Sequence, residues 1–75
     1  MISREKALQI FREAKDEQVT WFGENETCWL ARYENTGAAV CSKMNKQTGE
    51  IKTMWHDEWF DEVDAGHIKE LKLFD

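Results

Sequence analysis

One segment in the middle of the chain constrains the fold most, because its pattern is that of a complete β-hairpin. Residues 38–44 and 51–55 are typical of two strands, and residues 45–50 are typical of the turn between them. Asn45 can hydrogen-bond the backbone at the first turn position, and Gly49 can adopt a positive φ without steric cost. The spacing predicts a type I turn closed by a glycine bulge. Two strands alone are marginal in water, so the remaining residues must supply further strands and a cover.

The alternation of side chains divides this hairpin into two faces if Met44 pairs with Ile51. One face then carries Val40, Ser42, Met44, Ile51, Thr53 and Trp55. The other face carries Ala39, Cys41, Lys43, Lys52, Met54 and His56. This second face mixes apolar and charged residues. We therefore expect it to be open to water, or half covered by the C-terminal segment or by a partner.

An amphipathic helix and two further strands precede the hairpin in the sequence. Ser3 is a suitable N-cap, and apolar residues recur at helical spacing from there to a predicted end near Glu17 or Gln18. Residues 19–22 and 27–33 are rich in β-branched and aromatic side chains, which favours strands. Pairing of Tyr33 with Ala38 would place Trp29, Ala31 and Tyr33 on the Met44 face, and Cys28, Leu30 and Arg32 on the Cys41 face.

The end of the chain allows two interpretations. Val63, His67, Ile68, Leu71 and Phe74 recur at steps of three and four, which favours a second helix, but residues 68–74 could instead form an added strand. With the helix, the expected fold is one small α+β domain spanning residues 1–75. An N-terminal helix packs on a three- or four-stranded antiparallel sheet, and a short C-terminal helix completes the domain.

The net charge of −5 is confined to the last third of the chain. Residues 1–53 carry eight acidic and eight basic side chains, whereas residues 54–75 carry seven acids against two lysines, giving 2 − 7 = −5. A nucleic-acid binder would show a basic surface, so no direct contact with DNA or RNA is expected. No apolar run suits a membrane span, and the N-terminus lacks a signal-peptide core. We expect a cytoplasmic protein with no membrane contact, in which Cys28 and Cys41 are reduced thiols.

The order of elements resembles that of PepSY-like domains and of small bacterial immunity-type α+β proteins. The likeness is carried by the helix KALQIFREA, by the strand around residues 29–33 and by the turn NKQTGEI late in the sheet. Neither family has a catalytic motif to transfer to this chain. The resemblance therefore implies a binding or inhibitory role.

The sequence contains no familiar catalytic or phosphate-binding motif, so neither an enzymatic activity nor a cofactor is expected. His56, Asp57, Asp61 and His67 could surround a metal only if the tail folds back, and a solvated acidic face is the preferred interpretation. Cys41 shares its predicted face with His56, but strand thiols are usually inert parts of a core.

The candidate site is the aromatic and acidic segment that follows the hairpin. Its residues are Trp55, Asp57, Glu58, Trp59, Asp61, Glu62 and Asp64, with Phe60 embedded among them. Aromatic anchors ringed by negative charge suit a basic surface on another protein. We therefore expect a small protein-binding module, monomeric or homodimeric, that inhibits or neutralises a basic partner as an immunity protein or nucleic-acid mimic would. The alternatives are a structural module that self-associates through Cys28, Leu30, Cys41 and Met54, and a domain that binds a metal or small ligand.

Overall fold

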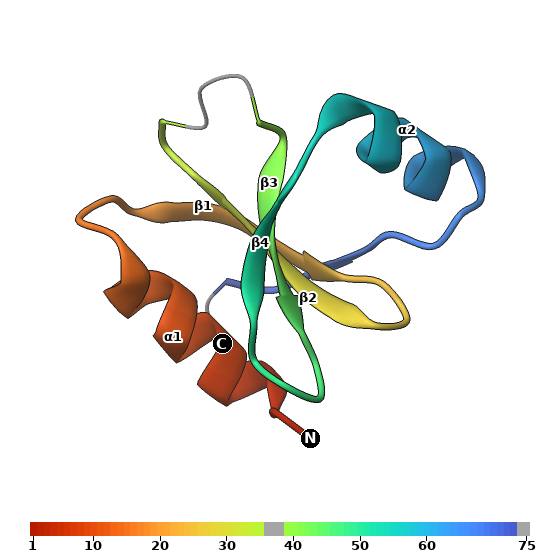
Figure 1. Cartoon of the computed structure of the whole chain (residues 1–75). Helices are drawn as coiled ribbons and strands as arrows, with labels where there is room; N and C mark the ends of the chain where they lie inside the picture. The colour runs from red at the N-terminus through yellow and green to blue at the C-terminus, as the bar shows by residue number, and fades with distance from the viewer. Residues whose placement is uncertain (36–38, 74–75) are drawn as a thin grey trace.

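The computed structural model describes residues 1–35 and 39–73, which form an α+β fold (Figure 1). Within this part, five antiparallel strands form one sheet in the order β4-β3-β2-β1-β5, so the sheet has more strands than the three or four expected. The two helices lie on opposite sides of the sheet (Figure 1). The elements are α1 (Arg4–Ala14), β1 (Val19–Glu24), β2 (Cys28–Tyr33), β3 (Cys41–Asn45), β4 (Ile51–Met54), α2 (His56–Asp64) and β5 (Lys69–Leu71).

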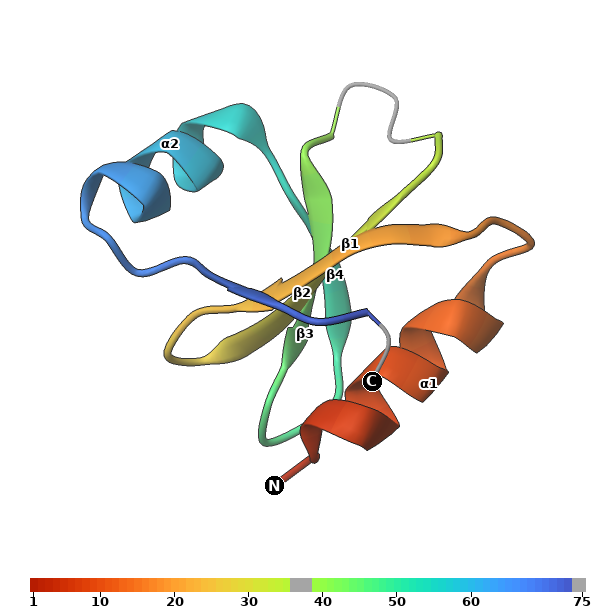
Figure 2. The same cartoon turned by 180° about the vertical axis from the view of Figure 1, so that it is seen from behind.

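Helix α1 begins at the predicted cap but ends earlier than predicted. The Ser3 hydroxyl accepts a hydrogen bond from the Lys6 backbone N–H at 3.2 Å, as an N-cap residue should. The helix ends at Ala14, and the following Lys15 is already extended, so the predicted end near Glu17 or Gln18 is wrong. Residues 15–18 are needed instead as the connection that brings the chain back to β1 (Figure 2).

The β3–β4 hairpin confirms the pairing of Met44 with Ile51 and the positive φ of Gly49, which is 79°. The Asn45 side chain accepts hydrogen bonds from the backbone N–H groups of Gln47 and Thr48, at 2.8 and 3.0 Å. The Gly49 N–H donates to the Asn45 carbonyl at 2.8 Å. This hydrogen bond joins residues four apart, whereas the hydrogen bond of a type I turn joins residues three apart.

The register between β2 and β3 differs by two residues from the one expected. Trp29 pairs with Met44 and Ala31 with Ser42, whereas a Tyr33–Ala38 pair would have required Ala31 to face Val40. Ala38 itself lies outside the described residues. A shift of two residues keeps every side chain on its predicted face, because strand side chains alternate with a period of two.

The C-terminal segment corrects the preferred interpretation of the tail. The second helix is the acidic segment itself, His56–Asp64, and it ends before Gly66, whose φ is 74°. Residues 69–71 form β5, which pairs with β1 through Phe22–Leu71, Gly23–Glu70 and Glu24–Lys69. The alternative of an added strand is therefore the one observed. Apolar residues at steps of three and four from Val63 onward do not by themselves define a helix. Gly66 interrupts the helical segment, and the residues beyond it pair with β1 as an edge strand.

The sheet separates two apolar clusters. The larger one, under α1, contains Ala7, Phe11, Phe22, Trp29, Ala31, Tyr33 and Met44. The smaller one contains Leu30, Cys41 and Met54, with Trp21, Cys28, Trp59 and Ile68 packed against it. The mixed face is therefore covered by α2 and the segment after it. Since Leu30, Cys41 and Met54 are almost fully buried, this face is not available for the self-association considered above. No helix among the described residues is long and apolar enough to cross a membrane.

Candidate functional site

Helix α2 is attached to the sheet through Trp59. The Trp59 ring meets Trp21 of β1 edge to face, with 5.7 Å between the ring centroids. The Arg32 guanidinium of β2 lies 4.8 Å from the centre of the same ring. Such contacts are favourable beyond the burial of apolar area. Trp59 is thus an internal anchor of the helix, and direct contact of this residue with a partner stays a prediction.

Two carboxylates of α2 are also engaged inside the molecule. Both oxygens of Glu58 accept hydrogen bonds from the Lys43 ammonium of β3, at 2.7 and 2.8 Å. Glu62 accepts a hydrogen bond from the Asn25 amide at 2.6 Å, and its other oxygen lies 2.7 Å from Nδ1 of His67. These contacts face the sheet and the β1–β2 turn. Glu58 and Glu62 therefore hold the helix in place and are only partly accessible.

The opposite side of α2 combines exposed apolar side chains with free carboxylates. Phe60 is 59% exposed and Val63 is 45% exposed. Asp57 and Asp64 lie three residues before and four residues after Phe60, so helical geometry places both carboxylates beside its ring. Within the described part of the chain, no ion-pair partner approaches either of them or Asp61. We call Asp57, Phe60, Asp61 and Asp64 the outer face of α2, and Val63, four residues after Trp59, borders it.

The charges on this helix do not all contribute to its stability. Asp57 lies in the first turn, where the helix dipole favours an anion. Asp61 and Asp64 lie toward the C-terminal end, where an anion is unfavourable, and the last turn contains no basic residue. In addition, no side chain caps the N-terminus of α2. Local helix stability therefore gives no reason for acids at positions 61 and 64.

Trp55 is separated from this surface. It is 57% exposed and has an extended backbone, with φ −94° and ψ 167°. Alternation along β4 places it on the side of Ile51 and Thr53, away from Met54 and α2. The seven predicted site residues therefore fall into three groups: Trp55 on the other side of the sheet, Glu58, Trp59 and Glu62 directed inward, and Asp57, Asp61 and Asp64 directed outward.

Phe60 was expected only as part of the acidic segment, and Val63 was not expected beside this surface. Helical spacing relates these residues to one another, but residues 58 and 60 lie at equal angles on either side of Trp59. The contacts of Glu58 with Lys43 and of Glu62 with Asn25 fix the rotation of α2, and Phe60 then turns outward. The missing information was which of two adjacent aromatic residues is internal, and the sequence alone treats them alike.

The other chemical candidates are not assembled. Among the described residues, no group of three or more His, Cys, Asp or Glu side chains is placed to hold a metal ion. His56 stacks on Phe60, with 6.3 Å between the ring centroids, while His67 contacts Glu62. Cys28 and Cys41 are free thiols. Burial raises the pKa of the Cys41 thiol to about 11, so little reactive thiolate forms at neutral pH.

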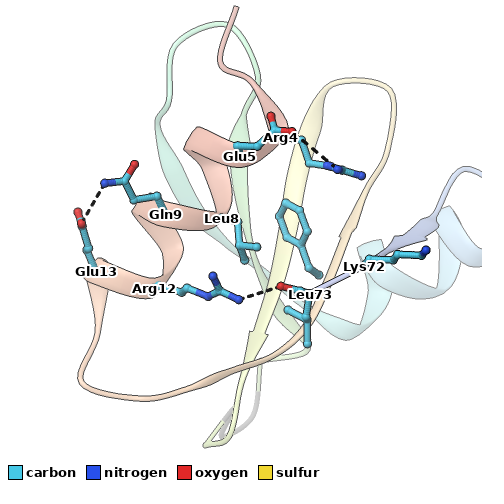
Figure 3. A pocket seen from close by; sticks show the side chains of 9 residues that line it. Arg4, Glu5, Leu8, Gln9, Arg12, Glu13, Lys72 and Leu73 are labelled. Carbon is cyan, nitrogen blue, oxygen red and sulfur yellow. Dashed lines mark hydrogen bonds and ion pairs between the residues drawn. The ribbon is translucent and has the colours of Figure 1, made fainter. Parts of the chain in front are cut away.

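A cavity of about 590 Å³ lies on the other side of the sheet, between α1 and the segment after β5 (Figure 3). Leu8 and Phe22 form its apolar part, and charged side chains of α1 surround it. The Arg12 guanidinium donates a hydrogen bond to the Leu73 carbonyl at 2.9 Å across it (Figure 3). Lys72 and Leu73 form one wall immediately before residues 74 and 75, which are outside the described part of the chain.

Comparison with protein-family models, with curated proteins and with solved structures gives no match for this chain. The resemblance to PepSY-like domains and immunity-type proteins therefore stays a prediction.

Proposed function

We propose that this protein is a non-enzymatic binding module that recognises a basic partner protein through the outer face of α2. The observation that carries the proposal is the exposed Phe60 ring between the carboxylates of Asp57 and Asp64. An aromatic side chain with few rotatable bonds can fill a pocket at small entropic cost, and the surrounding acids select against acidic partners. Acids in the last turn of a helix do not stabilise that helix, and such a role is the simplest explanation of Asp61 and Asp64.

The charge distribution supports a basic partner. Residues 55–64 contain five acidic side chains and no lysine or arginine. Lys43 neutralises Glu58 within the molecule, whereas Asp57, Asp61 and Asp64 direct their charge outward. Such a surface accelerates encounter with a positively charged protein and can imitate the phosphates that a nucleic-acid-handling protein binds. Inhibition or neutralisation of that partner is the role we infer.

The experiment uses the purified protein as bait in lysate of its native host, followed by surface plasmon resonance on the protein retained. Replacing Asp57, Asp61 and Asp64 by asparagine should lower the association rate and flatten its salt dependence. Salt screens the attraction between charges over about 8–10 Å at about 0.1–0.15 M ionic strength, so the effect of salt depends on these charges. Phe60→Ala should raise the dissociation rate by roughly 30-fold, equivalent to about 2 kcal/mol, if the ring fills a pocket.

Ile51→Ala is the matched control, because Ile51 is also exposed but lies on the other side of the sheet. It should leave partner binding unchanged. Binding that survives both the aspartate changes and Phe60→Ala would exclude the outer face of α2 as the recognition surface, and with it this proposed function.

A further inference from the structure

Strand β4 forms an open edge of the sheet, and Figure 1 views the sheet from this side. The Asn45 N–H donates to the Glu50 carbonyl and the Val40 N–H to the Met54 carbonyl, so backbone groups of Glu50 and Met54 point toward β3. In an antiparallel ladder the intervening odd-numbered residues point the other way. The N–H and C=O groups of Ile51 and Thr53 are therefore directed away from the sheet, where a further strand could pair with them.

An apolar stripe runs beside these free backbone groups. Ile51 is 40% exposed and Trp55 is 57% exposed, and Thr53 lies exposed between them on the same side of the sheet. Helix α1 packs over β1 and β2, so it does not hide this stripe. An edge strand with exposed apolar residues on one face is a surface that natural proteins either protect or use.

The two edges of the sheet differ in how well they are protected. At the other edge, β5 is only three residues long, and Lys69 and Glu70 are both exposed charged residues. Short, charged edge strands resist pairing with other chains. On β4 the charged residue is Lys52, which lies on the opposite face from Ile51 and Trp55 and contacts Glu50 at 3.1 Å. The apolar face of β4 thus has no charge of its own.

We propose that β4 pairs antiparallel with β4 of a second copy of this chain, about a two-fold axis at Thr53. Pairing about this axis would place Thr53 opposite Thr53 and Ile51 opposite Trp55 of the second copy. Both are cross-strand combinations that stabilise antiparallel sheets. The interface is isologous, because the same strand is used by both copies. It would join the two five-stranded sheets into one.

Alternative registers are less favourable. An axis at Lys52 would place the two Lys52 side chains directly opposite each other, and like charges in that position are destabilising. An axis at Ile51 would place Gly49, which has left-handed backbone geometry, opposite Thr53, so the new ladder would be interrupted by the turn. The self-complementary register at Thr53 favours a second copy over an unrelated extended segment as the occupant.

The helices leave room for this pairing. Helix α2 follows β4 and lies over the sheet of its own copy, because the Trp59 ring packs against Trp21 of β1. Helix α1 lies on the other side, over β1 and β2. A two-fold axis at the β4 edge therefore keeps each helix over its own sheet. This interface shares no residue with the outer face of α2, so dimerisation and partner binding can fail independently.

The first test is sedimentation velocity over a range of protein concentrations. Because two short strands bury little area, we expect a weak, concentration-dependent dimer. Thr53→Lys should abolish it by placing two positive charges at the axis. Thr20→Lys is the matched control, because Thr20 is exposed on β1, which is separated from β4 by two strands, and it should leave the dimer intact. Phe60→Ala should also leave it intact.

The second test locates the axis by disulfide cross-linking in a Cys28→Ser background, with copper phenanthroline as oxidant. Directly opposed residues of an antiparallel pair have Cα atoms about 5.5 Å apart, which suits a disulfide, so Thr53→Cys should cross-link about 10-fold faster than Ile51→Cys or Lys52→Cys. A monomer up to millimolar concentration, a dimer unaffected by Thr53→Lys, or fastest cross-linking at position 51 or 52 would each overturn the proposal. A monomer whose edge instead accepts an extended peptide from another protein would overturn it too.

Discussion

At the scale of single residues, two asparagines organise two turns of this sheet. The Asn45 carboxamide oxygen fixes the β3–β4 turn through the N–H groups of Gln47 and Thr48. Asn25 does the same for the β1–β2 turn, since its oxygen accepts hydrogen bonds from the N–H groups of Thr27 and Cys28. The Asn25 amide nitrogen also donates to Glu62, and this buried side chain thereby links the turn to α2. Buried polar groups of this kind are costly to leave unpaired.

The first prediction concerns Gly49 in the β3–β4 turn. Its φ of 79° is unfavourable for a β-branched residue, and an added Cβ would lie 2.9 Å from Cδ1 of Ile2. Gly49→Val should therefore lower the free energy of unfolding by about 1–2 kcal/mol, measured by chemical denaturation. Gly66→Val separates the two causes, because Gly66 has a similar φ of 74° but nothing within 4 Å of an added Cβ, so it should show the backbone strain alone and lower the free energy of unfolding less than Gly49→Val. A Gly49 variant as stable as the original protein would contradict this account of the turn.

At the scale of elements, α2 depends on few contacts and α1 on many. Helix α1 buries Ala7 and Phe11 completely and receives a 2.6 Å hydrogen bond from the Tyr33 hydroxyl to the Phe11 carbonyl. Helix α2 has no fully buried residue and is held by Trp59, by the Lys43–Glu58 pair and by the contacts of Glu62. Elements with few buried apolar contacts open most readily. We therefore expect α2 to be the less stable of the two helices.

The second prediction concerns Trp59, the aromatic residue that attaches α2 to the sheet. Trp59→Ala should lower the free energy of unfolding by about 2 kcal/mol, less than a fully buried tryptophan would, because Trp59 is only partly buried. Amide hydrogen exchange should show that protection falls in α2 before it falls in β1–β3. Trp55→Ala, measured at concentrations where the protein is monomeric, is the control and should change little, since Trp55 is 57% exposed. Equal effects of the two changes would show that Trp59 does not anchor the helix.

At the scale of the whole molecule, one sheet separates two cores of unequal size. The cluster under α1 contains the stacked rings of Phe22 and Trp29 and the edge-on contact of Phe11 with Phe22. The cluster under α2 contains three buried residues. The radius of gyration of 11.4 Å is that of a compact chain of this length, about 11 Å. Stability of the whole domain therefore rests mainly on the α1 side of the sheet.

The third prediction compares the same substitution on the two sides of the molecule. Phe11→Ala removes a completely buried ring and should lower the free energy of unfolding by about 3–5 kcal/mol, a large share of the stability of so small a domain. Phe60→Ala removes a ring that is 59% exposed and should leave the thermal melting temperature nearly unchanged. Circular dichroism melts of both variants measure this. If Phe60→Ala also unfolds the protein, its ring is structural and the proposed binding surface loses its anchor.

Local features of this protein could be predicted from the sequence because they depend on neighbouring residues. Ser3 caps α1, Gly49 supplies the positive φ of the turn, and Met44 pairs with Ile51 as the turn length requires. The assignment of strand residues to two faces also held, even though the β2–β3 register differed by two. Alternation has a period of two, so a shift of that size leaves each side chain on the same side of the sheet.

The tertiary structure decided the features that depend on distant residues. Residues 69–71 become a strand because β1 offers an open edge, although their own spacing also suits a helix. Trp59 and Phe60 are adjacent aromatic residues in one acidic helix, and only the position of Trp21 and Arg32 determines which ring turns inward. The seven predicted site residues therefore lie on different sides of α2 and of the sheet, and their part in binding stays a prediction. Helical periodicity relates the residues of α2 to each other, whereas its rotation is set by the sheet on which it packs.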